Sequence, residues 1–285
     1  MNSRTRLNFL VFIAAFLPGT FAFGQSSEMG LFLGIGTYKG EISPHLFNTK
    51  TIKPAVGILY RRNLNSHWAY RLGLTYGAVA GDDAKSNDEY QLRRNLSFRA
   101  RILDLHGAFE FNFLPYQLAN ESSAPATPFV FGGLSLYHFN PQAELNGDWY
   151  DLQPLGTEGQ GTSAYPSREK YKRTQMALMF GGGFKFKFSK MFGITLEAGA
   201  RRLYTDYLDD ISKTYADKGV LQAAYGDVSV QLSDRSTDGQ AADNTDRQRG
   251  NASDKDWYMF TGITLNFTLS SKYSSNCTPF RQKLR

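Results

Sequence analysis

Few residues of this chain have types and spacing that suit catalysis, and the best candidates are Asp104 and His106. They lie two positions apart in an alternating segment, so a strand would point both side chains to one face. A carboxylate beside an imidazole can act as a general acid–base pair. The alternative is a hydrogen-bond network inside a β-barrel, whose inward face is polar. The sequence has no G-x-S-x-G motif, and we predict no catalytic residues.

Metal-binding chemistry has little support in the sequence. The four histidines, at positions 45, 67, 106 and 138, have no second His or Cys at ligand spacing. The segment from Asp206 to Asp256 carries eleven Asp against six Lys or Arg, which makes calcium binding conceivable. No D-x-[DN]-x-[DN]-G pattern occurs in it, however. We therefore expect no metal and no cofactor, and we interpret this segment as a solvated, mobile external loop.

The composition excludes two classes of protein. The 285 residues are 41% hydrophobic and 14% aromatic, with 27 Gly and one Cys, and the mean hydropathy is −0.39. This average excludes a bundle of membrane helices, each of which needs roughly 20 consecutive apolar residues. A single Cys excludes an intramolecular disulfide scaffold. Abundant aromatics and glycines in a polar chain are typical of many short strands joined by turns.

Residues 1–24 have the layout of a secretory signal peptide. Arg4 and Arg6 form a positive n-region, Leu7–Leu17 an apolar h-region, and Ala22–Gly24 a small-x-small cleavage site. The alternative, a membrane anchor, is disfavoured because about eleven apolar residues cannot cross a hydrocarbon core ~30 Å thick. We therefore expect an exported protein whose mature chain begins near Gln25.

The mature chain contains segments of alternating hydrophobicity, the pattern of a strand with one apolar face. In the clearest one, Ile263, Leu265 and Phe267 share one face, and Thr264 and Asn266 share the other. There are eight such segments, at 29–38, 53–62, 67–79, 102–113, 128–139, 174–188, 192–202 and 257–269.

Two architectures share this pattern, a soluble β-sandwich and a transmembrane barrel. The longest segments exceed the usual sandwich strand of about 5–6 residues, and aromatic residues crowd their ends. Connections near 63–66 and Ser189 are short, whereas those at 39–52, 80–97, 140–173 and 205–256 are long. With the signal peptide, these features predict an all-β fold: an eight-stranded antiparallel transmembrane up-and-down β-barrel, with short periplasmic turns and long external loops.

The predicted domains are the signal peptide at 1–24, the barrel at 25–270 and a basic periplasmic tail at 271–285. An eight-stranded barrel has room inside only for side chains, so its inward charges must pair across the lumen. We predict a lumenal polar network that is packed rather than open. Its members are Arg71, Asp104, His106, Glu110, Lys185, Lys187, Glu197 and Arg201.

The tail has features that suit either partner docking or an inert end of the chain. It carries four basic residues and no acidic one, together with Cys277, Pro279 and Phe280. An odd cysteine in an oxidising compartment indicates a free thiol or an intermolecular bond. We select Cys277, Pro279 and Phe280 as candidate partner-binding residues.

Several strings carry a resemblance to a known family. They are KPAVGILYRRNLNSHWAYRLGLTYGAVAGDD (53–83), RNLSFRARILDL (94–105), FEFNFLPY (109–116), TPFVFGGLSLYHFNP (127–141), YDLQPLGTEGQG (150–161) and RRLYTDYLDDIS (201–212). In order and content they resemble the PorG-like outer-membrane β-barrels associated with type IX secretion. The resemblance implies an eight-stranded barrel linked to the periplasmic ring of a PorK-like lipoprotein and its PorN-like partner. It implies no catalytic residues.

From the residues and the resemblance together we expect a non-enzymatic barrel in the outer membrane of a Gram-negative bacterium. Its partners would be outer-membrane lipid and the periplasmic PorK/PorN ring, which it would anchor or align, and we expect no nucleic-acid partner. Two alternatives stay open. One is an outer-membrane enzyme that uses rim or lumenal residues, and the other is a surface adhesin or binding barrel that uses the long external loops.

Overall fold

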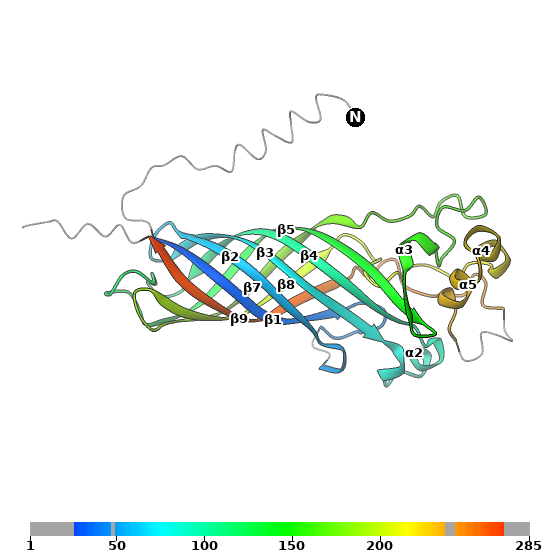
Figure 1. The fold of residues 1–285 in the computed structure, drawn as a ribbon, viewed down its shortest axis with the longest axis horizontal. Helices are drawn as coiled ribbons and strands as arrows, with labels where there is room; N and C mark the ends of the chain where they lie inside the picture. Colours follow the sequence, from blue (N-terminus) through cyan, green and yellow to red (C-terminus); the bar gives the residue numbers. More distant parts are fainter. Residues whose placement is uncertain (1–25, 47–48, 237–242, 271–285) are drawn as a thin grey trace, which may run out of the picture.

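The structure, a computed structural model, describes residues 26–46, 49–236 and 243–270, which form a closed β-barrel capped at one end (Figure 1). The predicted signal peptide and the predicted tail, including Cys277, Pro279 and Phe280, lie outside the described residues. The strands are β1 (Ser27–Lys39), β2 (Lys53–Asn63), β3 (Trp68–Asp82), β4 (Ser97–Asn112), β5 (Ala126–Leu145), β6 (Asp148–Asp151), β7 (Thr174–Lys187), β8 (Phe192–Leu203) and β9 (Trp257–Ser270).

Eight of these strands close the barrel, and each pairs antiparallel with its two neighbours. β1 pairs with β9, with Leu33 opposite Ile263, so the first and last strands seal the sheet. β4 pairs with β5, with Leu105 opposite Leu136. The prediction of an eight-stranded antiparallel barrel is confirmed.

The ninth strand, β6, folds back on the end of β5 as a hairpin. The connection is Asn146-Gly147, with φ of 55° and 91°. Both φ angles are positive, as a two-residue hairpin turn of matching twist requires. This hairpin lets β5 continue to Leu145, beyond the predicted end at 139.

The two ends of the barrel differ, as the loop lengths predict. One end, here the turn end, carries the connections 64–67, 113–125 and 188–191. The other, the loop end, carries 40–52, 83–96, 146–173 and 204–256. Ser27 lies opposite Ser270, so the chain enters and leaves the barrel at the turn end.

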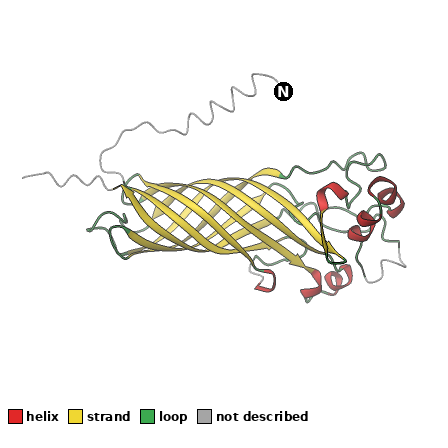
Figure 2. Cartoon of the chain, in the orientation of Figure 1, coloured by secondary structure: helices red, strands yellow, loops and turns green. Residues whose placement is uncertain are grey.

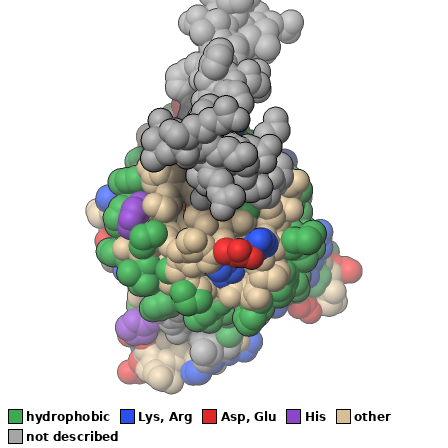
Figure 3. All heavy atoms as spheres, turned by 90° about the vertical axis from the view of Figure 1, so that its left-hand side faces the viewer, with side chains coloured by type: hydrophobic (Ala, Val, Ile, Leu, Met, Phe, Trp, Pro, Cys, Tyr) green, Lys and Arg blue, Asp and Glu red, His purple; other side chains and the backbone are tan. Residues whose placement is uncertain are grey.

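The outer surface of the barrel is apolar. Along β4, Leu103, Leu105 and Phe109 are exposed, while Asp104 and His106 between them are buried. The other strands alternate in the same way, and Figure 3 shows hydrophobic side chains around the rim of the turn end. An exposed apolar surface on this scale would make a soluble protein aggregate. A lipid-facing belt accounts for it.

Aromatic rings concentrate near the turn end of this belt. Trp68 lies 4.9 Å from Phe111 between ring centroids, and Phe111 lies 5.3 Å from Phe113. Phe192 packs against Phe267 at 5.5 Å. Aromatic side chains favour the membrane interface because they are apolar with a polarisable or polar edge, so this cluster is typical of a membrane girdle.

The loop end is covered by a folded cap, in which the helices of the chain gather (Figure 2). Among the described residues, no helix has the length and apolarity to cross a membrane. The helices are η1 (Thr49–Thr51), η2 (Asp83–Lys85), α2 (Glu89–Arg94), α3 (Leu152–Leu155), α4 (Lys218–Tyr225) and α5 (Asp227–Ser233).

The prediction of a solvated, mobile loop at 205–256 is wrong for its described residues. Leu208, Ile211 and Leu232 are buried there and join an apolar cluster that continues into the barrel. Phe139 of β5 and Tyr171 of the preceding loop belong to the same cluster. The prediction gave weight to the many charged residues of the segment and overlooked these few apolar ones. Each contributes about 1.5–3 kcal/mol to folding stability when fully buried.

Candidate functional site

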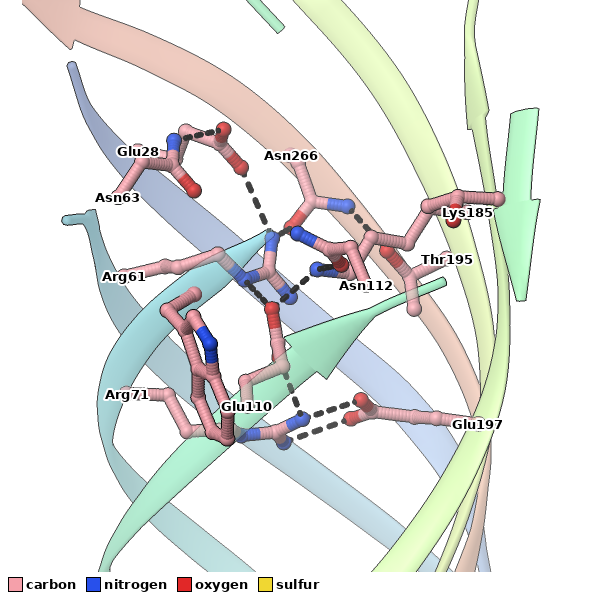
Figure 4. A network of polar contacts seen from close by, with 12 residues as sticks. Glu28, Arg61, Asn63, Arg71, Glu110, Asn112, Lys185, Thr195, Glu197 and Asn266 are labelled. Atoms are coloured by element: carbon pink, nitrogen blue, oxygen red, sulfur yellow. Dashed lines mark hydrogen bonds and ion pairs between the residues drawn. The ribbon is translucent and has the colours of Figure 1, made fainter. Parts of the chain in front are cut away.

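The carboxylate of Glu110 on β4 lies at the centre of a polar network. This network fills the half of the lumen next to the turn end, here called the turn half. Glu110 forms an ion pair with Lys185 of β7, and Arg61 Nε of β2 lies 2.9 Å from its Oε1. Arg71 Nη1 of β3 lies 3.6 Å from its Oε2. All four side chains are buried, and they reach the centre from four different strands (Figure 4).

Two further carboxylates balance these basic groups. Glu197 of β8 accepts two hydrogen bonds from Arg71, at 2.7 and 3.0 Å. Glu28 of β1 accepts one from Arg61 Nη1 at 2.9 Å and one from Asn63 at 2.8 Å. The buried acidic and basic side chains therefore neutralise one another in one connected network. Ionised groups can be buried only with such partners.

Asp104 holds a second cluster nearer the loop end. Arg201 Nε donates to its Oδ2 at 3.0 Å, and the Tyr258 hydroxyl donates to the same oxygen at 2.6 Å. His106 Nδ1 lies 2.9 Å from Oδ1. Both members of the proposed acid–base pair are buried, and the carboxylate is already engaged by an arginine and a tyrosine.

A small cavity lies between the two clusters. Its volume is about 20 Å³, and His106, Arg71, Glu197 and Arg201 are among the residues that line it. That is room for about one water molecule. Above it, towards the loop end, the inward side chains become apolar: Ile102, Tyr137 and Phe260 are buried there. The lumen is thus polar in its turn half and mainly aromatic and aliphatic in its loop half.

Seven of the eight residues predicted for the lumenal network are buried there, namely Arg71, Asp104, His106, Glu110, Lys185, Glu197 and Arg201. The eighth, Lys187, lies at the turn end and is half-buried. Its Nζ donates to the carbonyls of Asn120 and Ser123, at 2.8 and 3.0 Å, and so holds the 113–125 connection.

Sequence reasoning missed Glu28 and Arg61, which are both buried in the network. The alternation of inward and outward side chains along β1 and β2 could have identified both residues. Met29 and Leu31 point outward, which turns Glu28 inward, and Ile58 points outward, which turns Arg61 inward. Their strands are rich in apolar residues on both faces, so the pattern there is weak.

We expect Asp104→Asn to destabilise the barrel by about 1–3 kcal/mol, the usual cost of weakening hydrogen bonds to a charged partner. The reason is that Arg201 would lose its counter-charge while staying buried. Heat-modifiability on a gel, in which folded and unfolded barrels migrate differently, measures the change. If the variant instead kept its stability and lost a hydrolytic activity on lipid or peptide, the pair would be catalytic.

The cap at the loop end has its own buried ion pairs. Arg94 of α2 donates to both oxygens of Asp83, at 2.8 and 2.9 Å. Arg249 Nη1 lies 3.1 Å from Glu158 and donates to the carbonyl of Asp210 at 2.6 Å. The Arg249–Glu158 pair joins the segment 204–256 to the loop before β7.

Beside these pairs lies a group of four acidic residues, Glu41, Asp206, Asp209 and Asp256, here called the carboxylate group. Burial, and then the Asp206 charge, raise the pKa of Glu41 to about 8. Burial and the Asp209 charge raise the pKa of Asp206 to about 8. The pKa values of Asp209 and Asp256 are raised well above the ordinary range by burial and by the neighbouring carboxylates.

The closed barrel and its apolar belt define the class of protein: a β-barrel that spans a lipid bilayer. The chain belongs to the family described as Domain of unknown function (DUF6089), whose model matches residues 6–154, just over half of the chain. A comparison with curated proteins finds no match.

Three solved structures are similar in fold, all at low sequence identity. Neisserial surface protein A has 7% identity and a TM-score of 0.40, over 86% of this chain and 98% of that one. The attachment invasion locus protein Ail of Yersinia pestis has 10% identity and a TM-score of 0.38, over 86% and 100%. The outer membrane protein OprG of Pseudomonas aeruginosa has 9% identity and a TM-score of 0.40, over 86% and 96%.

Proposed function

We propose that this protein is a non-enzymatic outer-membrane barrel of a Gram-negative bacterium that anchors or aligns a periplasmic assembly. The observation that carries the proposal is the filled lumen. Paired charges occupy its turn half and aromatic side chains its loop half. A barrel filled in this way offers partners its two ends rather than a conduit.

The turn end is the end we assign to the periplasm. Short turns face the periplasm in outer-membrane barrels, and long loops face outward. Because Ser27 pairs with Ser270, the chain leaves the barrel at this end, and the basic sequence 271–285 follows directly. The resemblance of 53–83, 150–161 and 201–212 to the PorG-like family suggests the partner: the ring formed by a PorK-like lipoprotein and a PorN-like protein.

Deleting 271–285 tests this role. We expect the deletion to reduce recovery of the two ring proteins with the affinity-purified barrel by roughly tenfold, the effect of about 1.4 kcal/mol of binding free energy. Cys277→Ser in the full chain separates a thiol-dependent link from docking by the rest of the tail. Heat-modifiability must stay unchanged, since the deletion begins after the last strand. Undiminished recovery of the ring proteins would refute docking through the tail.

A further inference from the structure

The carboxylate group lies where three neighbouring strands end. Trp257, at the start of β9, is opposite Lys39 of β1 and also opposite Arg202 of β8. Glu41 follows the end of β1, Asp256 directly precedes β9, and Asp206 and Asp209 follow the end of β8. The sheet therefore brings together residues from opposite ends of the chain.

Three of these residues can reach one point. Glu41, Asp209 and Asp256 each offer one carboxylate oxygen, and these oxygens lie within 4.8 Å of one another. Hydrogen bonds fix one oxygen each of Glu41 and Asp256 and both oxygens of Asp209. Glu41 Oε1 accepts from the Asn251 amide at 3.2 Å. Asp256 Oδ2 accepts from the Leu208 amide at 2.8 Å, and Asp209 accepts from the Ile211 amide at 2.9 Å and from the Tyr38 hydroxyl.

The second oxygens of Glu41 and Asp256 lack partners among the described residues. Glu41 Oε2 and Asp256 Oδ1 are buried without a hydrogen bond. Asp206 gives the independent observation: its side chain is outside the three-residue group, it is only 3% exposed, and both its oxygens are buried without a hydrogen bond. The Asp256 amide donates to the carbonyl of Thr205 at 3.3 Å, which brings the next residue, Asp206, beside the group.

The carboxylate group has no basic partner within the described part of the chain, and the nearby buried Asp210, which also lacks one, is satisfied by the hydroxyls of Thr157 and Tyr171. Elsewhere, buried carboxylates such as Glu110, Asp104 and Asp83 form ion pairs with a Lys or Arg. None of the four members of the carboxylate group forms one with a described residue. A buried, unpaired carboxylate is costly, and clusters of them are stabilised by a bound cation.

Gly40 allows Glu41 to approach this closely. A Cβ at position 40 would lie 2.1 Å from Asp256 Oδ1 and 2.0 Å from the Tyr38 hydroxyl, so a larger residue would displace the loop. Glu41 is the member of the group that borders a groove. This groove, of about 520 Å³, is lined in part by Gly40, Glu41 and Lys255.

The geometry points to a divalent-cation site of the calcium type, formed by Glu41, Asp209 and Asp256, with Asp206 completing its negative charge. Carboxylate oxygens alone, without a His or Cys, are the donors that Ca²⁺ prefers. Water entering from the groove would supply the remaining ligands that a coordination number of about 6–8 requires. The bound ion would neutralise the group and tie the ends of β1, β8 and β9 to the cap.

Calcium titration of the purified, detergent-solubilised full chain tests the site. We expect isothermal calorimetry to give one saturable Ca²⁺ per chain, and the unfolding temperature to rise with CaCl₂ and fall again with EDTA. Extracellular calcium modules bind with Kd of about 10⁻⁴–10⁻³ M, so a titration to about 10 mM covers the range. At about 100 times Kd, the folded-to-unfolded ratio should rise about a hundredfold.

Two variants and one control identify the ligands. Glu41→Gln and Asp256→Asn should each lose the calcium response and, without calcium, unfold at a higher temperature than the wild type, because folding of the variant no longer has to bury or protonate that carboxylate. That combination cannot arise from misfolding. Glu169→Gln, an exposed residue of the same end of the barrel, should respond like the wild type. The proposal is overturned if no heat of binding appears, if matched NaCl gives the same shift, or if both variants still respond.

Discussion

A Glu110→Ala barrel is expected to lose about 3–5 kcal/mol of unfolding free energy, the cost of leaving buried charges without their partner. Glu110 is the acid that Lys185, Arg61 and Arg71 share. Glu197 and Glu28 remain in the variant, but each already serves one arginine. Lys185 would therefore keep only neutral partners, such as Asn112 at 2.7 Å.

The measurement is urea-dependent unfolding followed by heat-modifiability, with Glu121→Ala as the control. Glu121 also forms an ion pair, with Lys190 at 2.6 Å, but its side chain is 74% exposed. Exposed pairs contribute about 0–1 kcal/mol, so the control should unfold close to the wild type. If Glu110→Ala unfolds with the control, water must hydrate the lumenal charges, and the packed network proposed for this half of the barrel is refuted.

The barrel was predictable because alternation is local. The sequence of each strand shows by itself which side chains face lipid. Leu103 and Leu105 face outward, so Asp104 and His106, at the alternate positions, must face inward. Because the sheet closes into a barrel, inward charges from distant strands can be expected to meet in the lumen, as Arg71 and Glu197 do. Where apolar residues occur on both faces of a strand, as in β1, the alternation of polar and apolar residues is weak. The inward position of Glu28 was therefore missed.

The cap was not predictable because its contacts are not local. Arg249 meets Glu158, and Glu41 meets Asp256, only after the strands between them have paired. The polar composition of 205–256 led to the wrong prediction of a solvated loop. Four leucine and isoleucine side chains are buried there: Leu208, Ile211, Leu221 and Leu232. An ion site built from three separate strand ends likewise has no linear motif to detect.

Arg249 is the residue on which the attachment of the cap depends most. Its guanidinium bonds to the carbonyls of Ser233 and Asp210 and to the carboxylate of Glu158. Its own carbonyl accepts from Arg94 at 2.9 Å. One buried side chain thus connects α5, the segment after β8 and the loop before β7.

Arg249→Ala should therefore open the cap while the barrel stays folded. Loss of the cation leaves Glu158 buried and unpaired, which costs about 3–5 kcal/mol and raises the population of the open cap by about 10²–10⁴-fold. Trypsin cleavage after Lys213 or Lys218 reports that population. Arg247→Ala, two residues away and exposed, should be cleaved like the wild type. Equal cleavage rates in all three proteins would mean that the apolar cluster around Leu208 and Ile211 holds the cap closed without Arg249.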